Sequence, residues 1–176
     1  MRLFRRIKRW LKTIDDRGAA AVEFGIVGSA FMMMLLACFE FGYMLFIQSV
    51  LDNAARDAAR LIRTGQVQTS GSPTSTYSTL LCNEVGAVIG CGNLVYQALV
   101  FNDWTSAQTS LETPLTRSSN GTFTSSGFNP GTAGQIMVVT VAYNYSFFTP
   151  WIASLLGSSS NSAGLISTVV FQNEPY

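Results

Sequence analysis

The feature that most constrains this chain is an apolar run that covers residues 19–47. Within it Glu23 and Glu40 are charged, and the 16 residues from Phe24 to Phe39 carry no charge. As an α-helix those residues extend about 24 Å, and apolar residues 41–47 lengthen the stretch to match a hydrocarbon core of about 30 Å. The run is therefore predicted to be a transmembrane helix rather than a helix buried in a protein core.

Charge is distributed unevenly on the two sides of this run. Residues 1–18 hold seven Lys or Arg and two Asp, a net charge of about +5, whereas the remainder holds four Arg and eight acidic residues, about −4. A basic leader before one span stays in the cytoplasm, so the rest of the chain should cross the membrane. A basic arm can also bind nucleic acid, but beside a span it would be held at the bilayer, and no nucleic-acid partner is expected.

Three kinds of N-terminal processing compete over this segment. A secretory signal peptide is disfavoured because the apolar run is too long and lacks a good small-x-small exit site. A lipoprotein signal would end at Cys38, but the residues after Cys38 are strongly apolar where a polar tether is usual. The third kind is a prepilin-type leader, which ends in Gly directly before the apolar helix and places a Glu five residues into the mature chain.

The prepilin arrangement fits residues 18–24. Gly18 would be the last leader residue, Ala19 the new N-terminus and Glu23 the fifth mature residue. The new α-amine would be positively charged at neutral pH, and a carboxylate in the first helical turn complements that charge and the helix dipole. Between neighbouring subunits the same pairing could set the axial register. Gly18 and Ala19 are therefore the candidate cleavage site, and Glu23 with Phe24 is the candidate assembly site.

Helical periodicity continues beyond the apolar run through residues 48–65. An apolar stripe recurs at three- and four-residue spacing: Val50, Leu51, Ala54, Ala55, Ala58, Leu61 and Ile62. Polar and charged residues occupy the opposite face, and Gly65 supplies a stop. Ala19 to Thr64 are therefore predicted as one helix of 46 residues, about 70 Å long. The stripe is expected to pack against the chain's own outer domain.

Three groups of residues on this helix resemble a known family. They are residues 17–24, residues 39–42, and the block Asn-Ala-Ala-Arg-Asp-Ala-Ala-Arg at residues 53–60. They resemble the TadE-like proteins, which are minor pseudopilins of the tight-adherence (Tad/Flp) pilus machinery. Residues 169–176 resemble the end of that family more loosely. Phe24 stands where prepilins of this class more often have Tyr.

The resemblance implies a structural component that helps to assemble an adhesive pilus. Such a protein is inserted in the bacterial inner membrane, is trimmed by a prepilin peptidase after Gly18, and carries a pilin-like periplasmic domain. Its partners would be that membrane, the peptidase, other pilins or pseudopilins, and Tad assembly proteins, and it could enter an extracellular pilus. The candidate interface residues are Glu40, Asn53, Arg56 and Arg60. One alternative stays open: a single-pass envelope protein with an uncleaved anchor and an outer domain that binds a ligand or polysaccharide.

The predicted organisation is thus a leader at 1–18, a transmembrane helix at 19–47, an amphipathic extension at 48–65 and an outer domain at 66–176. The outer domain is expected to be α+β, with an antiparallel sheet of about three to four strands. Residues 94–101, 135–145 and 165–172 have the apolar, β-branched composition of strands. Residues 66–80 are expected to be a polar connector, and residues 78–89 a short helix.

Two further segments of the outer domain have distinct compositions. Residues 102–134 are rich in Ser, Thr, Asn and Gly, which predicts a long loop with a weak hairpin at residues 121–126. Residues 149–157 are expected to form a short helix. Its apolar residues are either packed on the sheet, which is favoured, or exposed as a patch: Trp151, Ile152, Leu155 and Leu156.

The residue inventory restricts the chemistry. Cys82 and Cys91 are expected to form a disulfide in an oxidising compartment. The chain has no histidine and three cysteines, so no metal site and no cofactor are expected. Without histidine no Ser/His or Cys/His pair can form, and there is no phosphate-binding glycine loop, so the chain is predicted not to be an enzyme.

Overall fold

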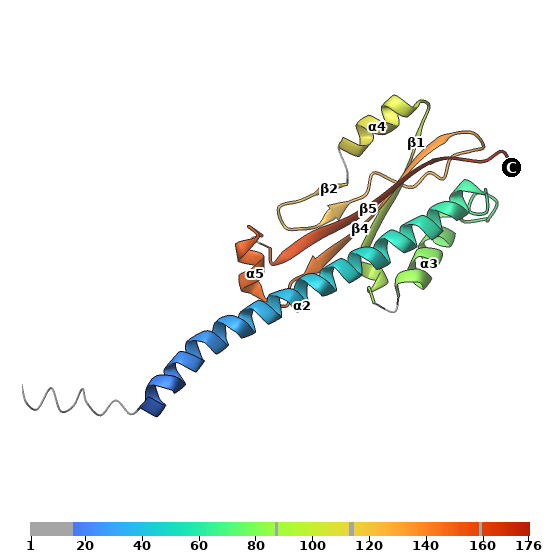
Figure 1. Ribbon diagram of the computed structural model, residues 1–176. Coiled ribbons are helices and arrows are strands. Elements are labelled where there is room, and N and C mark those ends of the chain that lie inside the picture. Colours follow the sequence, from blue (N-terminus) through green and yellow to red (C-terminus); the bar gives the residue numbers. More distant parts are fainter. Residues whose placement is uncertain (1–15, 87, 113–114, 159) are drawn as a thin grey trace, which may run out of the picture. The chain divides into compact units, whose positions relative to one another are not determined.

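The computed structural model describes residues 16–86, 88–112, 115–158 and 160–176, so residues 1–15 of the basic leader lie outside the described residues. The chain divides into two compact units, Met1–Phe41 and Gly42–Tyr176. The elements labelled in Figure 1 follow in chain order, with two that the figure leaves unlabelled: α2 (Asp16–Arg63), α3 (Pro73–Val85), η2 (Cys91–Asn93), β1 (Leu94–Phe101), α4 (Trp104–Glu112), β2 (Thr116–Arg117), β3 (Phe123–Thr124), β4 (Ile136–Ser146), α5 (Pro150–Leu155) and β5 (Ser162–Gln172).

Helix α2 is continuous over 48 residues, which confirms the prediction of one long helix, with its start three residues earlier than expected. It ends where the sequence predicted. Gly65 has a φ of +78°, and its N–H donates to the carbonyl of Ile62 while the N–H of Gln66 donates to the carbonyl of Leu61. This pair of bonds is the Schellman motif, which satisfies carbonyls that a helix end leaves without partners.

The main sheet is antiparallel with strand order β1-β4-β5. Strand β4 is central, and its Val139 pairs with Ala98 on one side and Val169 on the other. All of its residues from Ile136 to Ala142 are buried, because both faces of the sheet are covered. The predicted α+β class, with a long apolar helix before a small antiparallel sheet, is confirmed.

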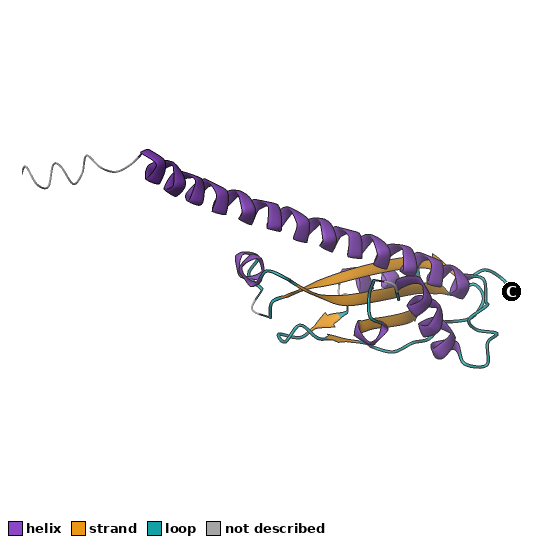
Figure 2. Cartoon of the chain, turned by 90° about the horizontal axis from the view of Figure 1, so that it is seen from below, coloured by secondary structure: helices purple, strands orange, loops and turns teal. Residues whose placement is uncertain are grey.

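Residues 42–63 of α2 lie along one face of the sheet, as Figure 2 shows. Helix α3 packs on the same sheet through Tyr77, whose ring centroid is 5.3 Å from that of Tyr96 in β1. Most of the predicted stripe is buried: Leu51, Ala54, Ala55, Ala58 and Ile62 are at most 2 % exposed. Val50 and Leu61, at the edges of the stripe, are partly buried. Its alanines let the helix axis approach the sheet closely, because a methyl group is the shortest apolar side chain at the contact. Gln48 adds a hydrogen bond from its Nε2 to the carbonyl of Ile166 in β5, at 3.1 Å.

Helix α3 begins at Pro73, so the prediction of a connector as far as residue 80 was wrong. Pro73 occupies the first turn, where a missing N–H leaves no carbonyl unpaired. Tyr77, Leu81 and Val85 lie one turn apart and are fully buried, and burial raises the pKa of the Tyr77 hydroxyl well above its usual range. The predicted disulfide between Cys82 and Cys91 is present, and it ties α3 to the short turn before β1.

The other face of the sheet carries α4 and the β2–β3 hairpin. The hairpin begins earlier than the predicted residues 121–126, because its first strand is β2 (Thr116–Arg117). Helix α4 replaces part of the expected loop at residues 102–134. Asp103 precedes α4, and its carboxylate accepts bonds from the N–H and the hydroxyl of Ser106, both at 2.8 Å. These bonds hold the pKa of Asp103 below its usual value. Ala107 of α4 then packs against Ile136 and Val138.

Helix α5 departs from the favoured prediction. Ile152 and Ala153 are buried, whereas Trp151 is 39 %, Leu155 76 % and Leu156 55 % exposed. The expectation that all four apolar residues pack on the sheet was therefore wrong for three of them. The buried side of this six-residue helix is centred between Ile152 and Ala153, so Trp151 and Leu155 lie toward its outer side.

The helix stop provides a test of this part of the fold. A Cβ on Gly65 would lie 2.5 Å from the ring of Tyr176, and the positive φ strains any L side chain. Gly65→Ala should therefore lower the free energy of unfolding by about 1–3 kcal/mol. Denaturant unfolding of the full chain in detergent would measure it. Gly71→Ala, which has open space around its Cβ, is the control, and equal effects of the two variants would contradict this view of the stop.

Candidate functional site

The first part of α2 does not pack against the rest of the described chain, and it is called the bare part of α2 from here on. Among the described residues, α2 is long and apolar enough to cross a membrane, and no part of its most apolar stretch is buried by the rest of the chain. Its exposed side chains are large: Val22, Phe24, Ile26, Val27, Phe31, Met32, Met33, Met34, Leu36 and Phe39. Exposing so much apolar surface to water is strongly unfavourable, so lipid or other protein chains must cover it.

The predicted cleavage and assembly residues all lie on this bare helix. Gly18, Ala19, Glu23 and Phe24 are exposed, and Phe24 is 78 % exposed. Because α2 already begins at Asp16, the junction between Gly18 and Ala19 lies inside the helix. Glu23 follows Ala19 by four residues, so its carboxylate lies about one turn from the atom that cleavage would convert into an amine.

The other candidate interface residues divide into two groups. Glu40 is 4 % exposed, so its side chain is buried. Asn53, Arg56 and Arg60 are exposed on the side of α2 that faces away from the buried stripe. Arg56 donates to the amide oxygen of Asn53 at 3.4 Å, so these two side chains form a polar surface that the chain itself leaves accessible.

The end of the chain contacts the end of α2, a contact that was not predicted from the sequence. Arg63 forms an ion pair with Glu174 at 2.8 Å, and the N–H of Glu174 donates to the carbonyl of Arg63. Asn173 is buried and donates to the carbonyls of Pro130 and Thr132. Residues 173–176 thus hold the end of the helix in place on the domain.

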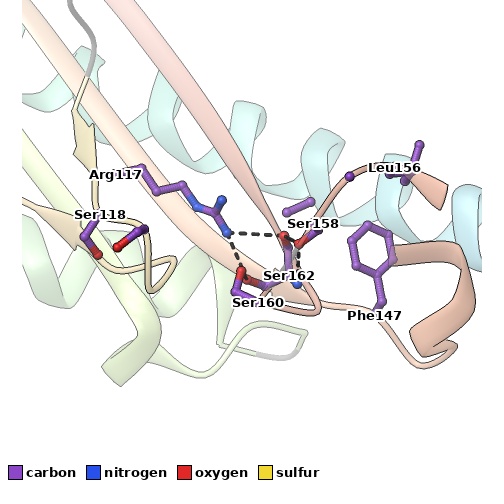
Figure 3. A pocket seen from close by; sticks show the side chains of 10 residues that line it. Arg117, Ser118, Phe147, Leu156, Ser158, Ser160 and Ser162 are labelled. Atoms are coloured by element: carbon purple, nitrogen blue, oxygen red, sulfur yellow. Dashed lines mark hydrogen bonds between the residues drawn. The ribbon is translucent and has the colours of Figure 1, made fainter. Parts of the chain in front are cut away.

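A shallow pocket of about 330 Å³ lies beside Arg117 (Figure 3). Its lining combines this cation with serine hydroxyls and three apolar side chains: Ser118, Ser119, Ser158, Ser160, Ser162, Phe147, Leu156 and Ala163. The Nη2 of Arg117 donates to Asn144 Oδ1 at 2.9 Å and to Ser162 Oγ at 2.9 Å, and the guanidinium lies 5.8 Å from the Phe123 ring centroid. Because protein acceptors already engage this group, its first role is to hold the hairpin on the sheet.

No metal centre is built from the described part of the chain. Within residues 16–86, 88–112, 115–158 and 160–176, no three His, Cys, Asp or Glu side chains come together in a group that could hold a metal ion. Cys38 is a free, exposed thiol on the bare part of α2.

Comparison with known protein families finds a match to part of α2. Residues 18–60 match the family model of TadE, described as TadE-like protein, which confirms the resemblance drawn from this part of the helix. The matched residues all lie within α2 (Asp16–Arg63). Neither the search of curated proteins nor the search of solved structures found a match.

Arg117 allows a test of how the hairpin is held. Arg117→Gln should remove the bonds to Asn144 and Ser162 and the contact with Phe123. Amide exchange at Ser118, whose N–H donates to the Thr122 carbonyl, should then accelerate by about three- to tenfold, because an exposed charged contact contributes about 1 kcal/mol. Exchange at Val139 in β4 should stay unchanged. Arg56→Gln is the control, and an unchanged rate at Ser118 in Arg117→Gln would contradict this role.

Proposed function

We propose that this protein is a minor pseudopilin-type structural component for assembly of an adhesive Tad/Flp-type pilus, cut by a prepilin peptidase after Gly18. The observation that carries the proposal is the division of α2 into a bare apolar part and a part buried in the domain, and the family match at residues 18–60 extends over both parts. A subunit needs both properties. Its helix must be free to pack against lipid first and against neighbouring helices later, and its domain must keep its fold throughout.

Glu23 fits a role in the transfer of the helix from lipid to a bundle of neighbouring helices. An ionised carboxylate within an apolar helix is unfavourable in hydrocarbon unless it is paired, so it favours the arrangement that supplies a cation. Cleavage after Gly18 would create such a cation at Ala19, and packing of neighbouring helices would bring one subunit's amine to another's Glu23. Phe24 would add a large exposed ring beside this pair.

The competing function is an uncleaved envelope protein that binds a ligand or polysaccharide. The pocket beside Arg117 is the described feature closest to such a site, yet its cation is engaged by the protein. The bare helix alone would serve either protein as an anchor. The family match and the Gly18–Glu23 spacing therefore favour the pilus component.

The N-terminus of the protein extracted from piliated cells tests the processing step. Cleavage after Gly18 should give a mature chain that starts at Ala19, identified by intact mass and N-terminal sequencing. Gly18→Val should block the cut, because a β-branched side chain at the junction hinders close approach of the peptidase to the backbone. Gly25→Val, also in open space, should be processed normally. An intact Met1 start in wild-type cells would support the uncleaved anchor, and a lipid on Cys38 would exclude both functions.

Glu23 can be tested separately from cleavage. Glu23→Gln keeps the shape of the side chain and removes its charge, so membrane insertion should be unchanged while pili per cell fall by about tenfold, equivalent to a lost interaction of about 1.4 kcal/mol. Electron microscopy of cells complemented with each variant would count the pili. Glu84→Gln removes the same charge from α3, where the side chain is exposed, and serves as the control. Normal piliation with Glu23→Gln would exclude the proposed pairing.

A further inference from the structure

The α5 region exposes a cluster of large apolar side chains that the domain does not use for its own core. Phe148 is 71 % and Leu155 76 % exposed, and Trp151 and Leu156 are exposed beside them. These four residues, here called the α5 patch, come from one short segment. Ile152 and Ala153 on its inner side are buried, so the segment is anchored to the domain while the patch points outward.

The α5 patch lies next to the outer end of the apolar run. Tyr43 packs against Phe148, with ring centroids 5.6 Å apart, and against Tyr145 at 6.2 Å. Tyr43 and Phe46 belong to residues 42–47, which are the end of the predicted span and also the first residues of the domain unit. Phe46 is 52 % exposed. The patch therefore lies beside residues 42–47, which are the end of the predicted span.

The chemistry of the segment matches a lipid surface better than a protein partner. Residues 118–173 contain no Asp, Glu, Lys or Arg, so the patch segment itself carries no charge. Arg117 lines a pocket together with Leu156, and a cation at this position suits the headgroup level of a bilayer. Trp, Tyr and Phe rings are typical of the boundary between headgroups and acyl chains. The serines that follow α5 at residues 158, 160 and 162 place hydroxyls beside the patch, at the level of polar headgroups.

We propose that the α5 patch is a second membrane contact, inserted at the headgroup boundary of the leaflet that faces the domain. The inference rests on the proposed function in one respect, namely that residues 19–47 span the bilayer. Two contacts, a helix and a patch beside it, fix the rotation of the domain about the α2 axis. The exposed side with Asn53, Arg56 and Arg60 would then face a set direction along the membrane and meet neighbouring subunits in one orientation.

Tryptophan quenching in the full-length chain tests this contact. The sequence has three tryptophans, so Trp10→Phe with Trp104→Phe leaves Trp151 as the reporter. In vesicles with acyl chains brominated near the headgroup, Trp151 emission should fall by about half, and bromine near the chain end should quench it less. The matched control is Trp10→Phe with Trp151→Phe, which leaves Trp104, 56 % exposed on α4. Its emission should not change with bromination.

Two further variants separate the possible outcomes. Phe31→Trp, in a chain with all three native tryptophans replaced by Phe, reports the span and should be quenched most by bromine near the chain end. If it is quenched while Trp151 is not, the patch proposal is wrong and the span stands. If neither is quenched, the span itself fails and the patch proposal fails with it. Leu155→Ser with Leu156→Ser should reduce quenching of Trp151 by about half, because both side chains are exposed contributors to the same contact.

The remaining alternative is that a second copy of the chain covers the α5 patch. In that case Trp151 would be shielded from aqueous iodide as the protein-to-lipid ratio rises, without any response to bromination. That result would overturn the membrane contact. Unchanged quenching of Trp151 after the double substitution at Leu155 and Leu156 would also overturn it, because the contact would then not depend on the patch.

Discussion

Helix α2 carries one unbroken series of backbone hydrogen bonds through two kinds of surroundings. In hydrocarbon every backbone N–H and C=O must find its partner within the helix, so the chain cannot bend or stop before it leaves the apolar run. Beyond the apolar run, α2 continues and forms one side of the domain core. Leu51, Ala55 and Ile62 are fully buried there, so the sheet is built directly on the continuation of the predicted anchor. The Gly65 stop ends this helix, and the C-terminal tail contacts that end through Arg63 and Glu174. Helix α3 then follows α2 in the chain.

Periodicity and composition predict the parts of this fold that depend on local sequence. The long helix, its stop at Gly65, the three main strands and the Cys82–Cys91 pair are all present as expected. Helix α4 was missed because Ser and Thr dominate its region. The available signal was Asp103 followed three residues later by Ser106, with Ala107 at the position that packs on the sheet.

The tertiary contacts were harder to predict, because they depend on which surfaces meet. Nothing in the spacing of residues 149–157 says that Ile152 and Ala153 are buried while Leu155 and Leu156 are not. The contact of Arg63 with Glu174 joins residues far apart in sequence, and a lone pair of opposite charges gives no sign of it. For the candidate site, the sequence identified Gly18, Ala19, Glu23 and Phe24, and the structure adds that these side chains are exposed on a bare helix.

The central claim is that α2 places its first part in hydrocarbon and its second part in water, and the native thiol of Cys38 tests this directly. Cys38 is a free exposed cysteine, whereas Cys82 and Cys91 are joined in a disulfide. A spin label on Cys38 of the full chain in vesicles should collide with dissolved oxygen and be protected from a water-soluble nickel complex. A label on Arg56→Cys, in a Cys38→Ala background, should show the reverse. Equal access of the nickel complex to both sites would contradict the claim.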